Sequence, residues 1–132
     1  MAETSSRSVQ CVVVTPERTV LDARVDFVSV PMYDGELGVL PGRAPLVGRL
    51  GPGELRTRRG NDVQRYFVDG GFAQVNNNVV TVLTPRAQKA EEIDTQAATR
   101  TLQNPPDGEA RAKNQERARV QLRVAQRAGR GS

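Results

Sequence analysis

The sequence contains no histidine, a single cysteine and only five aromatic residues in 132 positions. The absence of histidine excludes catalysis by a histidine base and zinc sites built on imidazole. The one cysteine, Cys11, allows no internal disulfide and is typical of a reducing compartment. We expect Cys11 to be a small core residue, because it begins an apolar run with no basic neighbour to lower the pKa of its thiol.

Long apolar runs and phosphate-binding motifs are also missing. No run approaches the roughly 20 apolar residues of a membrane-spanning helix, and the polar first ten residues lead us to expect no secretory signal. Neither a P-loop, a dinucleotide-binding glycine turn nor a nucleophile elbow occurs. An enzyme would therefore depend on carboxylates alone, and no spacing of the acids singles out a pair. We predict no catalytic residue, no metal and no cofactor.

The net charge of +4 is concentrated near the C-terminus. Residues 1–106 carry twelve basic and twelve acidic residues, whereas residues 107–132 carry seven basic residues against three acidic ones. Such asymmetry indicates an interaction surface in the C-terminal arm.

The first 85 residues have the pattern of a small all-β domain. Short β-branched runs alternate with Gly, Pro, Asn and Asp from residue 9 to residue 84. Tight turns are predicted at Asn76–Asn78 and Arg59–Asp62, where Asn and Gly tolerate positive φ. The predicted strands are Val9–Thr15, Thr19–Ala23, Val25–Pro31, Gly35–Leu40, Pro45–Leu50, Gly53–Arg58, Gln64–Asp69, Gly71–Val75 and Val79–Thr84.

After Pro85 helix-forming residues dominate. The pattern predicts helices over Gln88–Gln103 and Glu109–Ala128, separated by a Pro- and Gly-containing break at Asn104–Gly108. We therefore expect residues 86–132 to form an antiparallel helical hairpin. Its small apolar seam, which includes Ala118, Leu122 and Ala125, buries little area, so the hairpin is a weakly docked element that could open.

The aromatic residues are predicted to belong mostly to the core. Phe27, Tyr66, Phe67 and Phe72 lie in apolar strands. Tyr33 lies in a segment rich in Gly and Pro, residues 31–46, and is the aromatic residue we expect to be most exposed.

That segment carries a resemblance to a known family. The run DGELGVLPGRAPL, residues 34–46, closely resembles the signature loop of the epsilon subunit of bacterial F-type ATP synthase. The pieces VDFVSVP before it, YFVDGGFAQV after it and QLRVA near the end follow in the family's order and spacing. The resemblance covers residues 9–128, nearly the whole chain.

The resemblance implies a flattened sandwich of two packed, mostly antiparallel β-sheets, followed by the helical hairpin. It also implies a non-catalytic rotor subunit in the central stalk of a proton-transporting ATP synthase, one copy per complex. The sandwich would bind the gamma subunit and the membrane c-ring, peripheral to the cytoplasmic face of the bacterial inner membrane. Ring rotation would then reach the catalytic α/β hexamer.

Four residues of the signature loop are implied to face the ring, namely Asp34, Glu36, Gly42 and Arg43. A carboxylate such as Glu36 can pair with basic residues of the ring loops and fix orientation more than affinity. Arg43 stands where many relatives have histidine, so this donor is charged at every physiological pH.

The hairpin is implied to oppose ATP hydrolysis when it extends along gamma toward an acidic segment of the β subunits. The basic face of its last helix consists of Arg117, Arg119, Arg123 and Arg127 and would supply the complementary charge.

Some relatives also bind ATP between the helices through an [IL]-D-x-x-R-A motif. Here the matching stretch is Ile93-Asp94-Thr95-Gln96-Ala97-Ala98, in which Ala97 replaces the arginine. Gln121 stands where nucleotide-binding relatives have a second arginine, although Arg117 matches another. Losing cationic partners removes charge-assisted bonds to phosphate, so we predict weak or no ATP binding.

Two other classes are open from the residues alone. A small β domain with a basic tail also suits a binding module for nucleic acid or another acidic partner. Against nucleic acid, the β part is neutral and the arm has no aromatic residue for stacking. A stand-alone enzyme would have to work with carboxylates only.

Overall fold

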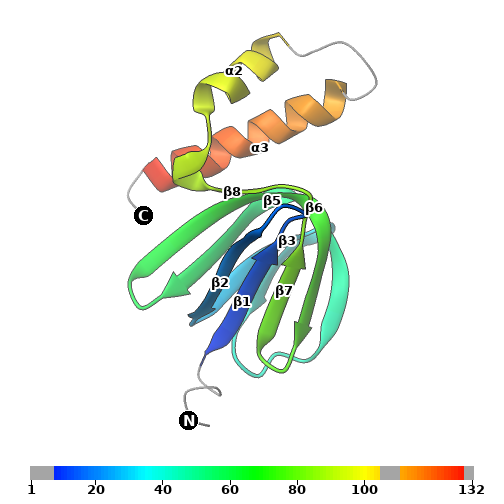
Figure 1. The fold of residues 1–132 in the computed structure, drawn as a ribbon, viewed down its shortest axis with the longest axis vertical. Coiled ribbons are helices and arrows are strands. Elements are labelled where there is room, and N and C mark those ends of the chain that lie inside the picture. The colour runs from blue at the N-terminus through cyan, green and yellow to red at the C-terminus, as the bar shows by residue number, and fades with distance from the viewer. Residues whose placement is uncertain (1–7, 105–110, 130–132) are drawn as a thin grey trace.

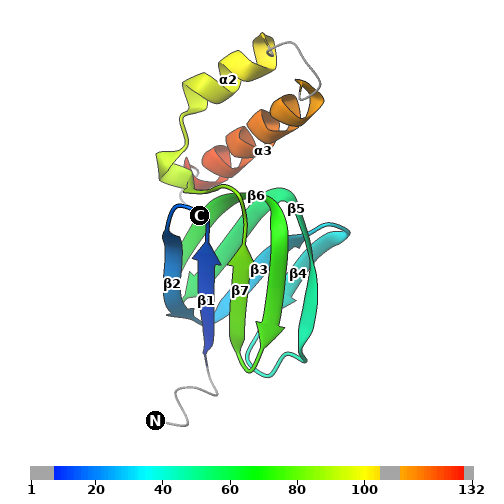
Figure 2. The same ribbon diagram turned by 45° about the vertical axis from the view of Figure 1, so that its right-hand side comes forward.

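The computed structural model of the protein describes residues 8–104 and 111–129. The described residues form eight strands, one short 3₁₀ helix and two α-helices. Their bounds are β1 (Val9–Val14), β2 (Thr19–Val25), β3 (Phe27–Met32), β4 (Gly35–Val39), β5 (Leu46–Arg59), β6 (Asp62–Asn76), β7 (Val79–Leu83), β8 (Ala87–Lys89), η1 (Ala90–Glu92), α2 (Thr95–Gln103) and α3 (Arg111–Gly129). The strands fold into a sandwich, and the two helices lie together at one end of it (Figures 1 and 2).

One hydrogen-bonded sheet supplies both layers of the sandwich. Its strand order is β2-β1-β7-β6-β5-β3-β4, with β8 paired to β6. Only the β1–β7 pair is parallel among these pairs. The first layer contains β2, β1, β7, the end of β6 and the start of β5. The second layer contains β4, β3, the end of β5, the start of β6 and β8. The predicted β-sandwich is confirmed, with its two layers joined through β5 and β6.

The joining strands bend at glycines. Gly70 and Gly71 have φ values of +80° and +108°, and Leu50 pairs with Gly71 while Pro52 pairs with Asp69. The prediction of four separate strands here is wrong, because hydrogen bonding continues on both sides of the bend. Glycine at positive φ turns the pair of strands without ending it.

The main core lies between the two layers. In β1 the burial alternates strictly, with Val9, Cys11 and Val13 fully buried. The predicted core position of Cys11 is therefore confirmed. Burial raises the pKa of its thiol to about 12, with a smaller contribution from the negative charge of Asp22.

The predicted turns agree with the structure. β6 ends at Asn76 and β7 begins at Val79, and the two intervening residues, Asn77 and Asn78, have φ values of +52° and +63°. Gly60, with φ +61°, lies in the turn between β5 and β6. Short polar side chains and glycine are the residues that tolerate this backbone region.

The predicted start of the first helix is wrong. Residues 87–89 pair with residues 66–68 of β6, because the edge of β6 offers hydrogen bonds that outweigh the helix propensity of Ala, Gln and Lys. α2 begins only after Asp94, whose carboxylate accepts a 3.0 Å hydrogen bond from the backbone N–H of Ala97. α3 agrees with its prediction over the described residues, while residues 105–110 lie outside them.

A second, smaller core joins the helices to the second layer. Phe67 points away from the main core and packs with Ala90, Ile93, Val120 and Val124. Its neighbours Tyr66 and Val68 face the main core. Three consecutive buried residues in β6 therefore mark the place where both faces of the second layer are covered.

Candidate functional site

The four residues predicted to face a ring lie in two places along β4. Asp34 is exposed in the turn before β4, and Glu36 is near its first residue. Gly42 and Arg43 are exposed beyond its end. A strand rises about 3.3 Å per residue, so the ends of β4 are roughly 13 Å apart. The structure thus arranges these residues as two pairs along one edge.

Glu36 is held by the second layer although it is exposed. The hydroxyl of Ser29, a buried residue of β3, donates a hydrogen bond to Oε1 of Glu36. Nη2 of Arg56 lies 3.8 Å from the same oxygen. The carboxylate is therefore oriented before any partner arrives.

The loop after β4 is fixed to the turn between β6 and β7. Gly42 has φ +89°, and its N–H donates a 2.7 Å hydrogen bond to Oδ1 of Asn78. The N–H of Arg43 bonds the carbonyl oxygen of Leu40 at 3.3 Å. The loop between β4 and β5, which contains Arg43, lies beside the β6–β7 turn, at the end of the sandwich opposite the helices (Figure 2).

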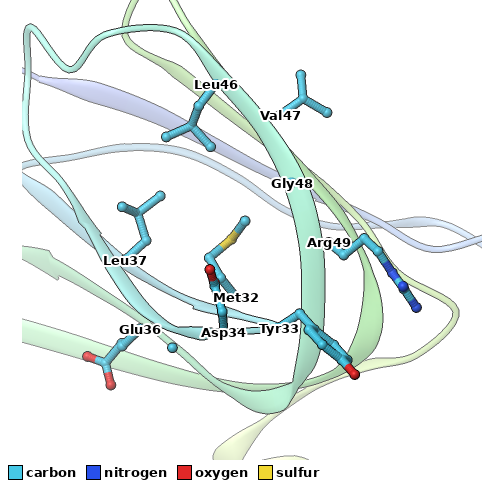
Figure 3. Close-up of a pocket in the computed structure, with 10 residues that line it drawn as sticks. Met32, Tyr33, Asp34, Glu36, Leu37, Leu46, Val47, Gly48 and Arg49 are labelled. Atoms are coloured by element: carbon cyan, nitrogen blue, oxygen red, sulfur yellow. The ribbon is translucent and has the colours of Figure 1, made fainter.

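A cavity of about 600 Å³ opens between β4 and β5 beside Glu36. Figure 3 shows the side chains of Met32, Leu37 and Leu46 pointing toward one another across this space, whereas Glu36 points away from it. The cavity is apolar inside, and it carries charged residues at its rim.

The outer face of the first layer exposes large apolar side chains. Val47, Phe72 and Leu83 are 72%, 55% and 53% exposed, and Phe72 pairs directly with Leu83. The prediction that Phe72 belongs to the core is wrong, since it lies on the outward face of its strand. Tyr33, 73% exposed as expected, lies 5.1 Å under the guanidinium of Arg49, which continues this surface.

The four arginines of the predicted basic face are not equivalent. Nε of Arg117 lies 2.8 Å from Oδ2 of Asp69, and Nη1 of Arg127 lies 3.5 Å from Oε2 of Glu54. Arg119 and Arg123 are exposed. Two of the four thus bind the sandwich in this conformation.

The altered nucleotide motif spans the start of α2, with Ile93 and Asp94 directly before the helix and Ala97 and Ala98 within it. Ile93 is buried in the second core, and Asp94 caps α2. Ala97 and Ala98 line a cavity of about 310 Å³ that Arg117 and Gln121 also line. Nε2 of Gln121 donates a 2.9 Å hydrogen bond to the side chain of Gln88.

Sequence reasoning missed the two carboxylates that bind the hairpin, Glu54 and Asp69. Each lies in a predicted strand whose sequence gives no sign of a partner outside the sheet. Their arginine partners lie 73 and 48 residues further along the chain. The available signal was the apolar run Tyr66–Val68, since a strand buried on both faces needs a second element to cover it.

The described residues, 8–104 and 111–129, contain neither a metal-binding cluster nor a membrane-spanning helix. No group of three or more His, Cys, Asp or Glu residues in these ranges could hold a metal ion. Within the same ranges, neither α-helix has the length and apolar character needed to span a bilayer.

Comparisons with known proteins agree with these features. Residues 8–90 match the family model for the β-sandwich domain of the ATP synthase delta/epsilon chain. An ATP synthase epsilon chain of Rhodopirellula baltica is 51% identical over 126 residues, covering 89% of this chain and 98% of the relative. One from a Synechococcus species is 38% identical, covering 86% and 90%.

Two solved structures share the fold. A chain in the mitochondrial ATP synthase of Euglena gracilis, solved as OSCP/F1/c-ring, has a TM-score of 0.70 and 25% identity, covering 95% of this chain and 81% of that one. A chain in the Tetrahymena thermophila mitochondrial ATP synthase has a TM-score of 0.63 and 16% identity, with 91% and 95% covered, and shows the fold alone.

The family match covers most of the chain, and the Rhodopirellula relative aligns over nearly its whole length. The chain therefore belongs to the ATP synthase epsilon chain family.

Proposed function

We propose that the chain is the non-catalytic rotor subunit of the central stalk of a bacterial, proton-transporting ATP synthase. The observation that carries this proposal is 51% identity to an epsilon chain over 98% of that relative. One copy per complex couples rotation of the c-ring to ATP synthesis, peripheral to the cytoplasmic face of the inner membrane. Residues 1–85 bind gamma and the ring, and residues 86–132 regulate ATP hydrolysis.

The outer face of the first layer is the proposed surface for gamma. Val47, Phe72 and Leu83 are exposed there on three neighbouring strands. Contiguous exposed apolar side chains indicate a protein–protein contact, since isolated exposed residues are ordinary but a patch is costly in water. A partner that covers this patch removes it from solvent.

The edge along β4 is the proposed surface for the c-ring. Asp34 and Glu36 carry negative charge at one end, and Arg43 carries positive charge beyond the other. Because Ser29 and Gly42 hold the two ends in place, basic and acidic groups on the ring loops can set the orientation of the sandwich.

The hairpin is the proposed brake on ATP hydrolysis. Arg117, Arg119, Arg123 and Arg127 lie on α3, the helix that would extend toward an acidic segment of the β subunits. Complementary charge would hold the extended helix there and oppose rotation in the hydrolysis direction.

The brake can be tested with full-length chains on the matching α/β/gamma complex. The double charge reversal Arg119→Glu and Arg123→Glu should raise the concentration of the chain needed to inhibit ATP hydrolysis by about tenfold or more. Binding to gamma should be unchanged. Arg59→Glu, an exposed change at the last residue of β5, is the control for charge reversal away from α3. Equal inhibition by wild type and the double variant would contradict the proposed brake.

Nucleotide binding is expected to be weak or absent. Ala97 puts no cation into the cavity between the helices, and Gln121 is already bonded to Gln88. Calorimetry with ATP should therefore give no saturable heat at micromolar concentrations. A micromolar Kd would contradict this expectation.

A further inference from the structure

The contact between α3 and the sandwich combines a small apolar centre with an ion pair at each end. Val120 and Val124 pack on Phe67 in the centre. Arg117 binds Asp69 toward one end of the contact, and Arg127 binds Glu54 toward the other. We propose that Asp69 and Glu54 form an ion-pair latch that holds the hairpin closed and engages two arginines of the basic face. The regulatory meaning of the latch rests on the proposed function.

The Asp69 end is the strong end of the latch. Nε of Arg117 lies 2.8 Å from Oδ2 of Asp69, and the two side chains are only 24% and 18% exposed. Asn114, one turn earlier on α3, accepts a 3.1 Å bond from Nη1 of Arg117. The N–H of Asp69 is bonded to Oγ1 of Thr84, which fixes the backbone. Short charge-assisted bonds between pre-positioned groups are stronger than exposed ion pairs.

The Glu54 end is crowded with positive charge. Oε2 of Glu54 lies 3.0 Å from Nη1 of Arg65, 3.5 Å from Nη1 of Arg127 and 3.8 Å from Nη1 of Arg56. The Glu54 side chain is 9% exposed, and its Oε1 is buried with no hydrogen-bond partner among the described residues. Arg127, the hairpin's contribution, is 49% exposed.

The two ends respond differently when the hairpin leaves. Glu54 keeps Arg65 and Arg56, both of which belong to the sandwich. Among the described residues, Arg117 is the one cation within ion-pair distance of Asp69. Opening the hairpin thus removes the ion-pair partner of Asp69, whereas Glu54 keeps two of its partners. Asp69 therefore governs the closed state.

The latch and an acidic partner compete for the same groups. In the closed state Arg117 lies against the sandwich with Nε bonded to Asp69 and Nη1 bonded to Asn114, and its side chain is only 24% exposed, so little of it is presented to a carboxylate of another subunit. Arg119 and Arg123 remain exposed in the closed state and can attract such a partner first. The closed hairpin therefore has two of its four arginines engaged with the sandwich, and the open hairpin releases both.

The latch can be tested on the full chain by measuring the closed fraction directly. Spin labels at Asn76→Cys and Gln126→Cys, both exposed positions, report the distance between the far end of the sandwich and α3. The native Cys11 is buried and stays unlabelled. Asp69→Asn and Arg117→Gln should each lower the closed-to-open ratio about tenfold. Arg127→Gln should lower it about twofold or less.

Two further variants sharpen the result. Asp62→Asn removes an exposed carboxylate of the same strand, β6, and should leave the ratio unchanged. The exchange of Asp69→Lys with Arg117→Glu should restore closure relative to either single change. Unchanged distances in both Asp69→Asn and Arg117→Gln would overturn the latch.

Inhibition assays separate the latch from the proposed function. Asp69→Asn keeps all four arginines, so it should inhibit ATP hydrolysis by the α/β/gamma complex at about tenfold lower concentration than wild type. If this variant opens the hairpin and inhibition does not increase, the latch stands and the proposed brake is wrong. If it inhibits more strongly while the hairpin stays closed, the latch is wrong.

Discussion

The sandwich and the hairpin are held by interactions of different kinds. Among the described residues, sixteen buried side chains, mostly valines, form the main core. Five buried side chains form the second core, which is completed by ion pairs. Since apolar burial contributes about 25 cal/mol per Å², the hairpin has much less to hold it than the sandwich. We therefore expect the sandwich to act as a stable platform from which the hairpin can open.

The largest effect is expected from a glycine that shapes the platform. Gly71 has φ +108°, and a Cβ there would overlap the backbone carbonyl oxygen of Leu83 in β7. Gly71→Ala should lower the free energy of unfolding by about 3 kcal/mol or more, because strain and overlap add. Gly60→Ala is the matched control, as Gly60 also has positive φ but meets no atom within 4 Å. Its cost should be about 1 kcal/mol by denaturant titration. Equal costs for the two would contradict the proposed strain at the bend.

The next effect should separate the two cores. Phe67→Ala removes the centre of the second core, and truncating a buried phenylalanine costs about 3 kcal/mol or more. The hairpin should therefore be mostly open in this variant, as measured by the distance between labels at positions 76 and 126. Leu55→Ala, a truncation in the main core, is the control. It should lower the unfolding free energy and leave the closed fraction of folded molecules unchanged.

The first layer is more predictable from the sequence than the bends that join the two layers. The alternating runs and the pair Asn77–Asn78 predict the first layer closely, because strand periodicity and turn chemistry are local signals. The bends at Gly51–Gly53 and Gly70–Gly71 were predicted as strand ends. A glycine that turns a strand and a glycine that ends one look the same in sequence.

The rest depends on partners distant along the chain. Residues 87–89 resemble helix and become a strand because an edge of β6 is available to pair with them. The pair Asp69–Arg117 spans 48 residues, and no periodicity specifies which carboxylate meets which arginine. The candidate ring residues were found through the family loop, and their separation along β4 required the structure.

A pH-dependent effect, small near pH 9, follows from the buried thiol of the platform. The pKa of Cys11 is raised from 9.0 to about 12 in the folded state, mainly by burial. Below pH 9 both folded and unfolded chains keep the proton. Between pH 9 and pH 12 only the folded chain keeps it, so unfolding free energy should fall by up to about 1.4 kcal/mol per pH unit. Cys11→Ala should remove this part of the slope in denaturant titrations. An unchanged slope would show that Cys11 does not titrate in this way.

The smallest effect on stability is expected from an exposed charge at the proposed ring surface. Glu36 lies 3.8 Å from Arg56 with a side chain 60% exposed, and exposed ion pairs contribute about 0–1 kcal/mol. Glu36→Gln should therefore change the unfolding free energy by less than about 0.5 kcal/mol and leave the hairpin closed. It should nevertheless weaken coupling of ATP hydrolysis to proton pumping in reconstituted complexes, because the oriented carboxylate is lost at the proposed ring surface. Asp62→Asn, an exposed change away from β4, should leave coupling intact. If Glu36→Gln instead opens the hairpin, charge on this edge reaches the latch through Arg56, and the platform and the hairpin are not energetically separate.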